Sequence, residues 1–117
     1  MKTEYIIFTP GHASGEWHEI DWPVEPGYDR IAKLIEPLLG EKEPLEHVTV
    51  LYEGRRADMF VSEYGHMTLT HREPLPINDR ATEIYRAAWL SRHPKDDPAT
   101  LPSIAGVAVL FTRIVWV

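Results

Sequence analysis

The sequence contains no cysteine, no long apolar run and no excess of basic residues. Without cysteine the chain forms no disulfide, offers no thiolate to a metal and has no cysteine nucleophile. The longest apolar run, residues 107–111, is far shorter than the about 20 residues that span a bilayer. The first residues offer one lysine and a short apolar stretch, which does not match a secretory signal. These absences lead us to expect a cytoplasmic protein with no membrane segment.

The missing basic excess also bears on nucleic acids. Residues 1–47 carry ten acidic and four basic side chains, whereas residues 48–117 carry eight of each. An acidic first third repels phosphate, and the rest has no surplus charge to attract it, so direct nucleic-acid binding is disfavoured. An acidic face can instead dock on a basic partner protein. A net charge of -6 is also an ordinary solubility charge for a small domain, and this second reading stays open.

The hydrophobic pattern predicts one α+β domain over residues 1–117, with an antiparallel or mixed β-sheet covered by two α-helices in the order ββαβββαβ. Alternating or β-rich segments predict the strands, and apolar residues at helical spacing predict the helices. The predicted strands cover residues 4–9, 16–22, 48–52, 57–62, 66–70 and 104–111, and the predicted helices cover residues 28–36 and 79–93. The first helix is expected to end or kink near Glu36, because Pro37 removes a backbone donor.

The second predicted helix has the clearest signals in the chain. Asn78 is a favoured N-cap, Asp79 lies in the first turn, and Pro94 follows the last turn. Its core-facing stripe comprises Ala81, Ile84, Tyr85, Ala88 and Trp89. This helix is therefore expected to cover one face of the sheet.

The end of the given sequence, residues 104–117, is unusually apolar. Residues 104–111 are apolar on both faces, which predicts a central strand covered by a helix on one side and by further protein or a partner on the other. Residues 114–117 are also apolar, and we expect them either to be tucked against the sheet or to pair across a homodimer.

Three segments, DMFVSEYG, PLPINDRATEIYRAAWL and IAGVAVLF, resemble a family of small domains of unknown function encoded by bacteriophages, plasmids and other bacterial mobile elements. The resemblance covers residues 58–111. It implies a small cytoplasmic accessory protein of mobile DNA, and it brings no established activity, cofactor or catalytic residue. This chain departs from the family pattern by inserting Tyr64 before Gly65 and by a long approach over residues 71–76.

The sequence holds no recognisable catalytic or cofactor motif. Glycine patterns of phosphate-binding loops and of dinucleotide folds are missing, and no serine lies in a G-x-S-x-G context. His12 and His18, with Glu16 and Asp21, resemble a metal set in composition only, because strand alternation places His18 and Asp21 on opposite faces. We therefore expect no metal and no cofactor, and the sequence does not indicate catalysis.

Eight residues are candidate binding residues. Trp17 and Trp22, with Glu19 and Asp21 between them, predict an exposed or interfacial patch that combines aromatic and acidic groups. The remaining four candidates are basic or lie at a helix start: Arg55, Arg56, Asn78 and Arg80.

The basic candidates form two predicted sites. Arg55 and Arg56 flank a hairpin turn, where they could stack or bind phosphate together with Tyr52 and Tyr64. Asn78 and Arg80 lie where free N–H groups of the second helix could hold an anion, although Asp79 opposes this reading. Solvated arginines and a self-capped helix are the alternatives.

The leading hypothesis from the sequence is a non-enzymatic accessory binding protein of a mobile element, which acts through protein–protein contact. Its sharper form is an inhibitor of a host defence or nucleic-acid-processing protein. The alternative hypothesis is a small-molecule or nucleotide-binding protein, with hydrolase activity as an open extension, that uses a groove near Asn78, Arg80 and Arg55.

Overall fold

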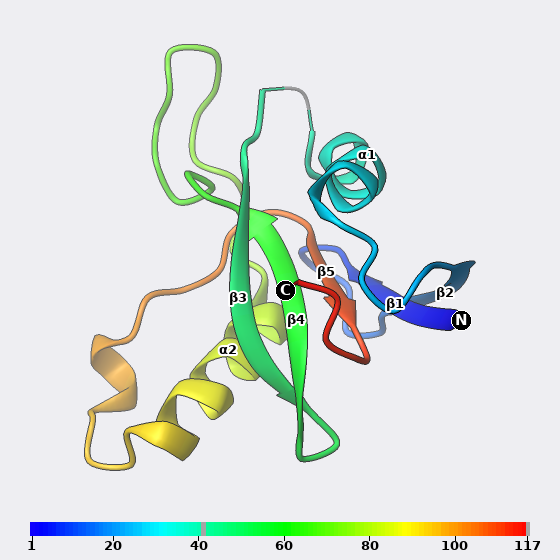
Figure 1. Cartoon of the computed structure of the whole chain (residues 1–117). Coiled ribbons are helices and arrows are strands. Elements are labelled where there is room, and N and C mark those ends of the chain that lie inside the picture. Colours follow the sequence, from blue (N-terminus) through cyan, green and yellow to red (C-terminus); the bar gives the residue numbers. More distant parts are fainter. Residues whose placement is uncertain (41, 117) are drawn as a thin grey trace.

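The computed structural model describes residues 1–40 and 42–116 (Figure 1). The predicted α+β class is confirmed, and the strands and helices follow one another as ββαββαβ. Their bounds are β1 Lys2–Phe8, β2 Glu16–Asp21, α1 Tyr28–Leu39, β3 Leu45–Tyr52, β4 Arg55–Ser62, α2 Asp79–Arg92 and β5 Ala108–Phe111. A single 3-10 turn, Pro98–Thr100, lies in the connection between α2 and β5.

The five strands form one sheet in the order β2-β1-β5-β4-β3, and each neighbouring pair is antiparallel. Two hairpins, β1–β2 and β3–β4, make the two halves. Strand β5 lies between them, with Val109 opposite both Ile7 and Phe60. The last strand of the described chain is therefore the central strand of the sheet, as its two apolar faces predict.

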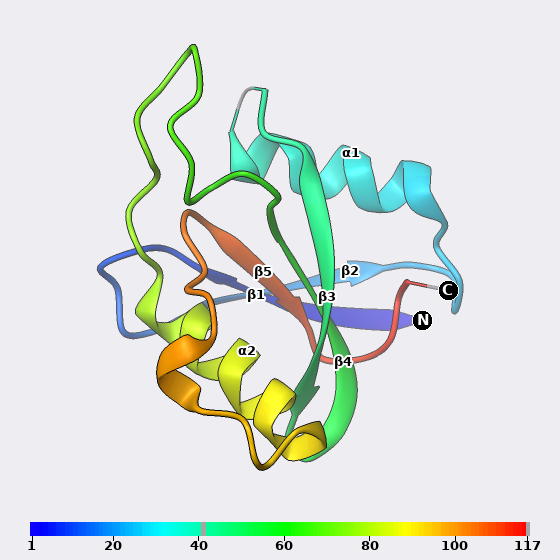
Figure 2. The same cartoon turned by 90° about the vertical axis from the view of Figure 1, so that its left-hand side faces the viewer.

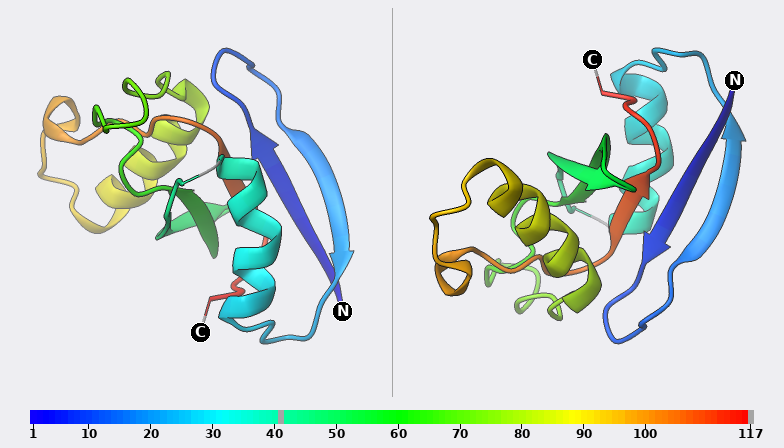
Figure 3. Two further views of the ribbon diagram at one scale, coloured as in Figure 1. Left: turned by 90° about the horizontal axis from the view of Figure 1, so that it is seen from above. Right: turned by 90° about the horizontal axis from the view of Figure 1, so that it is seen from below.

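The two helices cover opposite faces of the sheet (Figures 2 and 3). Because side chains alternate along a strand, β5 presents Leu110 to the α2 side and Phe111 to the α1 side. The core of the α1 side includes Ile31, Ile35, Leu39, Phe60, Val109 and Phe111. The core of the α2 side includes Ala81, Ala88, Val50, Met59, Ala108 and Leu110. Helix α1, rather than a partner, covers the second face of the central strand.

Helix α1 does not end at Glu36, so the first alternative of that prediction is wrong, whereas the second alternative, a kink, stays a prediction. The helix continues through Pro37 to Leu39, where the N–H of Gly40 donates to the carbonyl of Glu36 at 3.2 Å. Burial of Ile35 and Leu39 explains the continuation, because packing on the sheet outweighs the one backbone donor that proline lacks.

The strand predicted over residues 66–70 is absent, which corrects the expected three-stranded meander. Strand β4 has β3 on one edge and β5 on the other, so no edge is free for a third neighbour. The segment instead bends back on itself through an isolated bridge between Leu69 and Arg72. The Arg72 guanidinium donates to the carbonyls of Tyr64, Met67 and Glu73, and these bonds replace those of a strand ladder.

A buried ion pair fixes this long connection to the rest of the fold. The carboxylate of Glu43 accepts hydrogen bonds from the Arg72 guanidinium and from the Ser62 hydroxyl. Hydrogen bonding from Arg72 holds the pKa of Glu43 below its usual value, against the opposing effect of burial. The Ser62 hydroxyl and the charge of Arg72 lower this pKa further. The segment between β4 and α2 is therefore organised around one arginine rather than around regular secondary structure.

The apolar C-terminal segment is tucked against the α1 side of the sheet. Val115 is buried, and Trp116 stacks on His47 with ring centroids 5.3 Å apart. The Asp58 carboxylate accepts hydrogen bonds from the N–H groups of Val115 at 2.7 Å and Trp116 at 2.8 Å. The predicted position of the segment holds for Val115 and Trp116, whereas Ile114 is 44% exposed. Val117 lies outside the described residues, and homodimer pairing stays a prediction.

Asn78 caps α2, as its type and position predict. Its Oδ1 accepts from the N–H of Ala81 at 3.1 Å, and its Nδ2 donates to the carbonyls of Phe8 at 3.0 Å and Gly106 at 2.9 Å. With 1% of its surface exposed, the side chain joins α2 to β1 and to the start of β5. The cap is thus also a tertiary contact.

We expect Asn78→Ala to lower the free energy of unfolding by about 2 kcal/mol, because it removes a helix cap and leaves two buried carbonyls without donors. Urea denaturation followed by circular dichroism measures the change. Asp79→Ala is the neighbouring control, since it alters the first turn of the same helix at an exposed position. Equal stability of the Asn78→Ala and wild-type proteins would contradict the structural role.

Candidate functional site

A cleft of about 410 Å³ opens on the α2 side of the sheet, between the β1–β2 hairpin, the tip of the β3–β4 hairpin and α2. It exists because α2 packs mainly on β3 and makes few contacts with β1 and β2. The lining residues are Ile6, Phe8, Ala13, Gly15, Trp17, Leu51, Tyr52, Glu53, Arg80, Ile84 and Leu110. Its floor is apolar, and its rim carries the aromatic and charged groups.

Trp17 stands at the mouth of this cleft with 53% of its surface exposed. It is paired with Ile6 in the β1–β2 register, and directly opposite residues share a face, so Trp17 projects on the α2 side. Its ring meets the Tyr52 ring edge to face, with centroids 6.2 Å apart and an interplanar angle of 72°. The two rings come from opposite ends of the sheet order and form an aromatic corner.

Gly15 allows the wall of the cleft to lie close to its floor. A Cβ added at this position would meet Ile6 Cγ2 at 2.2 Å and Phe8 Cε1 at 2.8 Å. Only glycine therefore lets the turn before β2 approach β1 so closely. This approach sets the position from which Trp17 reaches Tyr52.

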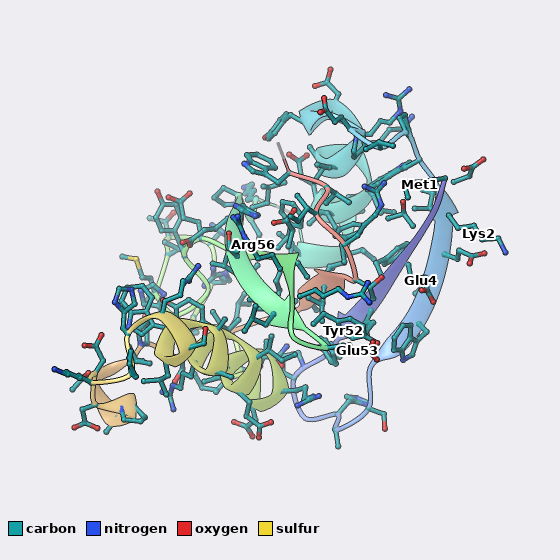
Figure 4. All side chains as sticks on the ribbon, turned by 60° about the horizontal axis from the view of Figure 1, so that its bottom comes forward. Met1, Lys2, Glu4, Tyr52, Glu53 and Arg56 are labelled. Atoms are coloured by element: carbon teal, nitrogen blue, oxygen red, sulfur yellow. The ribbon has the colours of Figure 1, made fainter. Side chains whose placement is uncertain are left out.

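Acidic side chains surround the aromatic corner. Glu19 lies opposite Glu4 in the register, which places both on the same face as Trp17. Glu53 follows Tyr52 directly, and Figure 4 shows Tyr52 and Glu53 at the hairpin tip, beside the strand that carries Glu4. Burial, then the charges of Glu53 and Glu4, raise the pKa of the Tyr52 hydroxyl above its usual value.

Arg80 is the cationic residue of the lining. Its guanidinium donates to Glu83 at 3.3 Å and lies 6.0 Å from the ring centroid of Phe8. Phe8 lies in the floor of the cleft, whereas Glu83 lies beside Arg80 on α2, outside the lining. The cleft therefore has a cationic end beside α2 and an aromatic, acidic end at the hairpin tip.

The structure brings together only part of the predicted acidic patch. Trp17, Glu19 and Asp21 project from one face of β2, and Asp21 accepts from the N-terminal amine at 2.9 Å. Trp22 does not belong to the patch, because it is 5% exposed and stacks on Phe111 with centroids 5.3 Å apart. Its expected exposure is wrong: the chain turns inward after β2 and adds this ring to the core of the α1 side.

The predicted basic site assembles only in part, and the predicted anion-binding site does not assemble. Arg55 lies opposite Tyr52 in the β3–β4 register, so these two share a face, whereas Arg56 projects to the other face and lies apart from Tyr52 in Figure 4. Tyr64 follows the other end of β4 and does not join them. The side chain of Asn78 is occupied by its three internal hydrogen bonds, so it offers nothing to a ligand. Of the groove residues proposed around Asn78, only Arg80 reaches a cleft.

The described histidines have structural or exposed surroundings. His47 Nε2 lies 2.6 Å from Asp58 Oδ1, and His18 Nε2 lies 2.7 Å from Glu16 Oε1. Within residues 1–40 and 42–116, no three His, Asp or Glu side chains gather closely enough to hold a metal ion. Neither α1 nor α2 is long and apolar enough to cross a membrane, and the same holds for any helix in these ranges.

Sequence reasoning missed how Tyr52 and Glu53 contribute to the site. Tyr52 follows Trp17 by 35 residues in the sequence, so no local pattern links the two rings. The signal that was present is the alternation of β3, which places Tyr52 on the same face as the buried Val50.

Comparison of the chain with protein-family models, with curated proteins and with solved structures finds no match. The resemblance carried by residues 58–111 therefore stays a prediction.

Proposed function

We propose that the protein is a non-enzymatic binding protein that acts through protein–protein contact, with the cleft beside Trp17 as the contact site. The observation that carries the proposal is the exposure of Trp17 at the mouth of an open cleft, in contact with Tyr52. Exposed tryptophan and tyrosine beside a pocket are typical anchors of protein interfaces. The resemblance of residues 58–111 supports the further proposal that the protein is an accessory protein of a mobile genetic element.

The surroundings of the buried acids also favour binding over catalysis. Asp58 accepts two backbone N–H groups and contacts His47, and Glu43 is held by Arg72 and Ser62. These bonds use the carboxylate oxygens to fix the fold, so neither acid is free to take a proton from a substrate. The exposure of Trp17 beside the cleft, in contrast, is not explained by a role in holding the fold together.

The sharper form of the proposal is inhibition of a host defence or nucleic-acid-processing protein. Proteins that bind nucleic acids carry basic surfaces, and an acidic protein can occupy such a surface. Support comes from the exposed acids of the β1–β2 hairpin and of the connection to α1: Glu16, Glu19, Asp21 and Glu25.

Affinity capture tests the proposed function. We expect the immobilised protein to retain a defined partner from a lysate of the natural host, and Trp17→Ala to retain at least about 10-fold less, as removal of an interface anchor does. Tyr28→Ala is the matched control, because Tyr28 is 55% exposed but belongs to α1 on the other side of the sheet. Native mass spectrometry of the eluted complex identifies the partner and its stoichiometry.

Two outcomes would reject the proposal. One is an absence of any partner together with turnover of a substrate by the purified protein. The other is a partner whose capture is changed neither by Trp17→Ala nor by reversing the charges of four exposed acids: Glu16, Glu19, Asp21 and Glu25.

The alternative function, binding of a nucleotide or another small molecule, has one supporting observation. Arg80, Trp17 and Tyr52 line the same cleft, and such groups can hold a phosphate and a base. Glu53 in the lining and Glu83 on the Arg80 guanidinium oppose a phosphate there. A thermal-shift screen with nucleotides separates the two functions, since a ligand at 100 times its dissociation constant adds about 2.7 kcal/mol.

A further inference from the structure

The aromatic corner of the cleft has an unused ring face. Trp17 is more than half exposed although Tyr52 packs edge-on against it, and Phe8 and Ile6 close the floor behind the two rings. An indole face with this exposure attracts cations through the quadrupole of the ring. The corner thus has the shape and the electronic character of a binding site for a cationic group.

The charges around the corner reinforce this preference. Glu53 lines the cleft directly, and Glu4 lies close enough to Tyr52 to act on its hydroxyl. Glu19 stands opposite Glu4 on the same face, and two basic residues share this face: Lys2 at the far end of β1, and Arg55 opposite Tyr52. Three carboxylates and one nearby guanidinium, that of Arg55, therefore lie around the two rings, and their net charge is negative.

Arg80 does not cancel this negative charge. Its guanidinium is paired with Glu83 at 3.3 Å and lies over the Phe8 ring, so its charge is compensated at the α2 end of the cleft. The two hairpins contribute the aromatic, acidic end of the cleft, and α2 contributes the cationic end. A bound chain segment could place a basic side chain at the first end and a carboxylate or carbonyl oxygen at the second.

We propose that the cleft recognises a basic segment of the partner protein, with an arginine or lysine side chain seated against Trp17 and Tyr52 between Glu4, Glu19 and Glu53. This inference rests on the proposed function and names the chemistry of the partner. A cleft of about 410 Å³ exceeds the volume of one such side chain, so it also takes neighbouring residues of the segment. Arginine is favoured over lysine, because its planar guanidinium stacks on an aromatic face and bonds carboxylates in pairs.

Titration with a hexa-arginine peptide, blocked at both ends, tests the inference. In ¹H–¹⁵N spectra at low ionic strength we expect the Trp17 indole signal and the backbone signals of Tyr52 and Glu53 to shift first. Trp17→Ala and Trp17→Leu leave the net charge unchanged, and each should weaken binding about 3- to 5-fold through loss of the ring face. Tyr28→Ala, which removes an exposed ring elsewhere, should leave the affinity unchanged.

The contribution of the carboxylates is measured separately. Glu4→Gln combined with Glu53→Gln should weaken binding by about 5-fold or more and flatten its dependence on salt. The control pair, Glu36→Gln with Glu73→Gln, changes the net charge by the same amount at exposed positions on α1 and on the β4–α2 connection. A hexa-glutamate peptide should not bind.

The outcomes separate this inference from the proposed function. The proposed cation-binding site would be overturned if Trp17→Ala and Trp17→Leu left peptide binding intact, or if the shifted signals mapped to the α1 side. If no basic peptide binds while a partner is still captured through Trp17, the cation-binding site is rejected and the proposed function stands. If neither binds, both are rejected.

Discussion

Replacing Asp58 with alanine is expected to lower the free energy of unfolding by about 3 kcal/mol, because it removes a buried carboxylate and leaves its hydrogen-bond donors without an acceptor. Asp58 is 3% exposed, and its Oδ2 accepts the N–H groups of Val115 and Trp116. Its Oδ1 lies 2.6 Å from His47 Nε2, and the His47 ring stacks on Trp116. The substitution therefore releases the C-terminal segment as well as one histidine.

Asp58→Asn separates the geometry of these bonds from their charge. The asparagine oxygen can still accept both backbone N–H groups, and its amide can donate to the His47 nitrogen, so the loss should be about 1 kcal/mol. Urea denaturation followed by tryptophan fluorescence measures both variants, with Glu36→Ala as an exposed control. If Asp58→Ala proved as stable as Asp58→Asn, the carboxylate would not hold the C-terminal segment.

Replacing Arg72 with methionine is expected to lower the melting temperature by about 10 °C, because the Glu43 carboxylate stays buried without its counter-charge. The Arg72 guanidinium donates hydrogen bonds to the Glu43 carboxylate and to three carbonyls of the β4–α2 connection. This connection has no regular secondary structure of its own. Methionine keeps much of the side-chain volume, so the effect reports on polar contacts rather than on a cavity. Differential scanning calorimetry at pH 7 measures it.

The pH dependence of the stability of Arg72→Met tests whether Glu43 causes the loss of stability. In the wild type the pKa of Glu43 is depressed, so its stabilisation is present above the ordinary value of 4.5 and is lost as the pH falls through the folded pKa. In Arg72→Met, burial of the carboxylate is opposed only by the Ser62 hydroxyl and by His71, and we expect its pKa to rise above the unfolded value. Acidification from pH 7 to about 5 should therefore recover stability in the variant and not in the wild type.

One further group must be held fixed in this experiment. His71 Nε2 lies 3.8 Å from the same Glu43 carboxylate, so His71→Gln is introduced into both proteins. Adding Glu43→Gln to Arg72→Met should abolish the recovery at low pH. A parallel pH profile for the single variant and the double variant would show that Glu43 is not responsible.

The sequence predicted those features whose causes lie within a few residues. The cap at Asn78, the stop before Pro94 and most of the stripe of α2 are local and appear in the structure. Trp89 is the exception, because it lies outside the core of the α2 side and its indole N–H donates to the exposed Asp96 at 2.8 Å. The central position of β5 was also predictable, because an apolar run without alternation requires cover on both faces. Local propensity and patterning specify these elements without reference to a partner strand.

The features that sequence reasoning missed depend on contacts between distant residues. The strand expected over 66–70 is absent because β5, which follows about 40 residues later, occupies the edge of β4 that it would need. Trp22 turned out to be core because Phe111 lies beside it. The contact between Trp17 and Tyr52 joins two separate hairpins, and no pattern within either hairpin indicates it.

The position of β5 has a consequence for the order in which the protein can assemble during translation. Both hairpins leave the ribosome before residues 108–111, yet the sheet is not continuous until β5 joins β1 to β4. Until then the inner edges of β1 and β4 are unpaired, and such edges are prone to pair with other chains. The nascent protein therefore passes through a stage with two open half-sheets, and the cleft between the hairpins forms only when the last strand closes them.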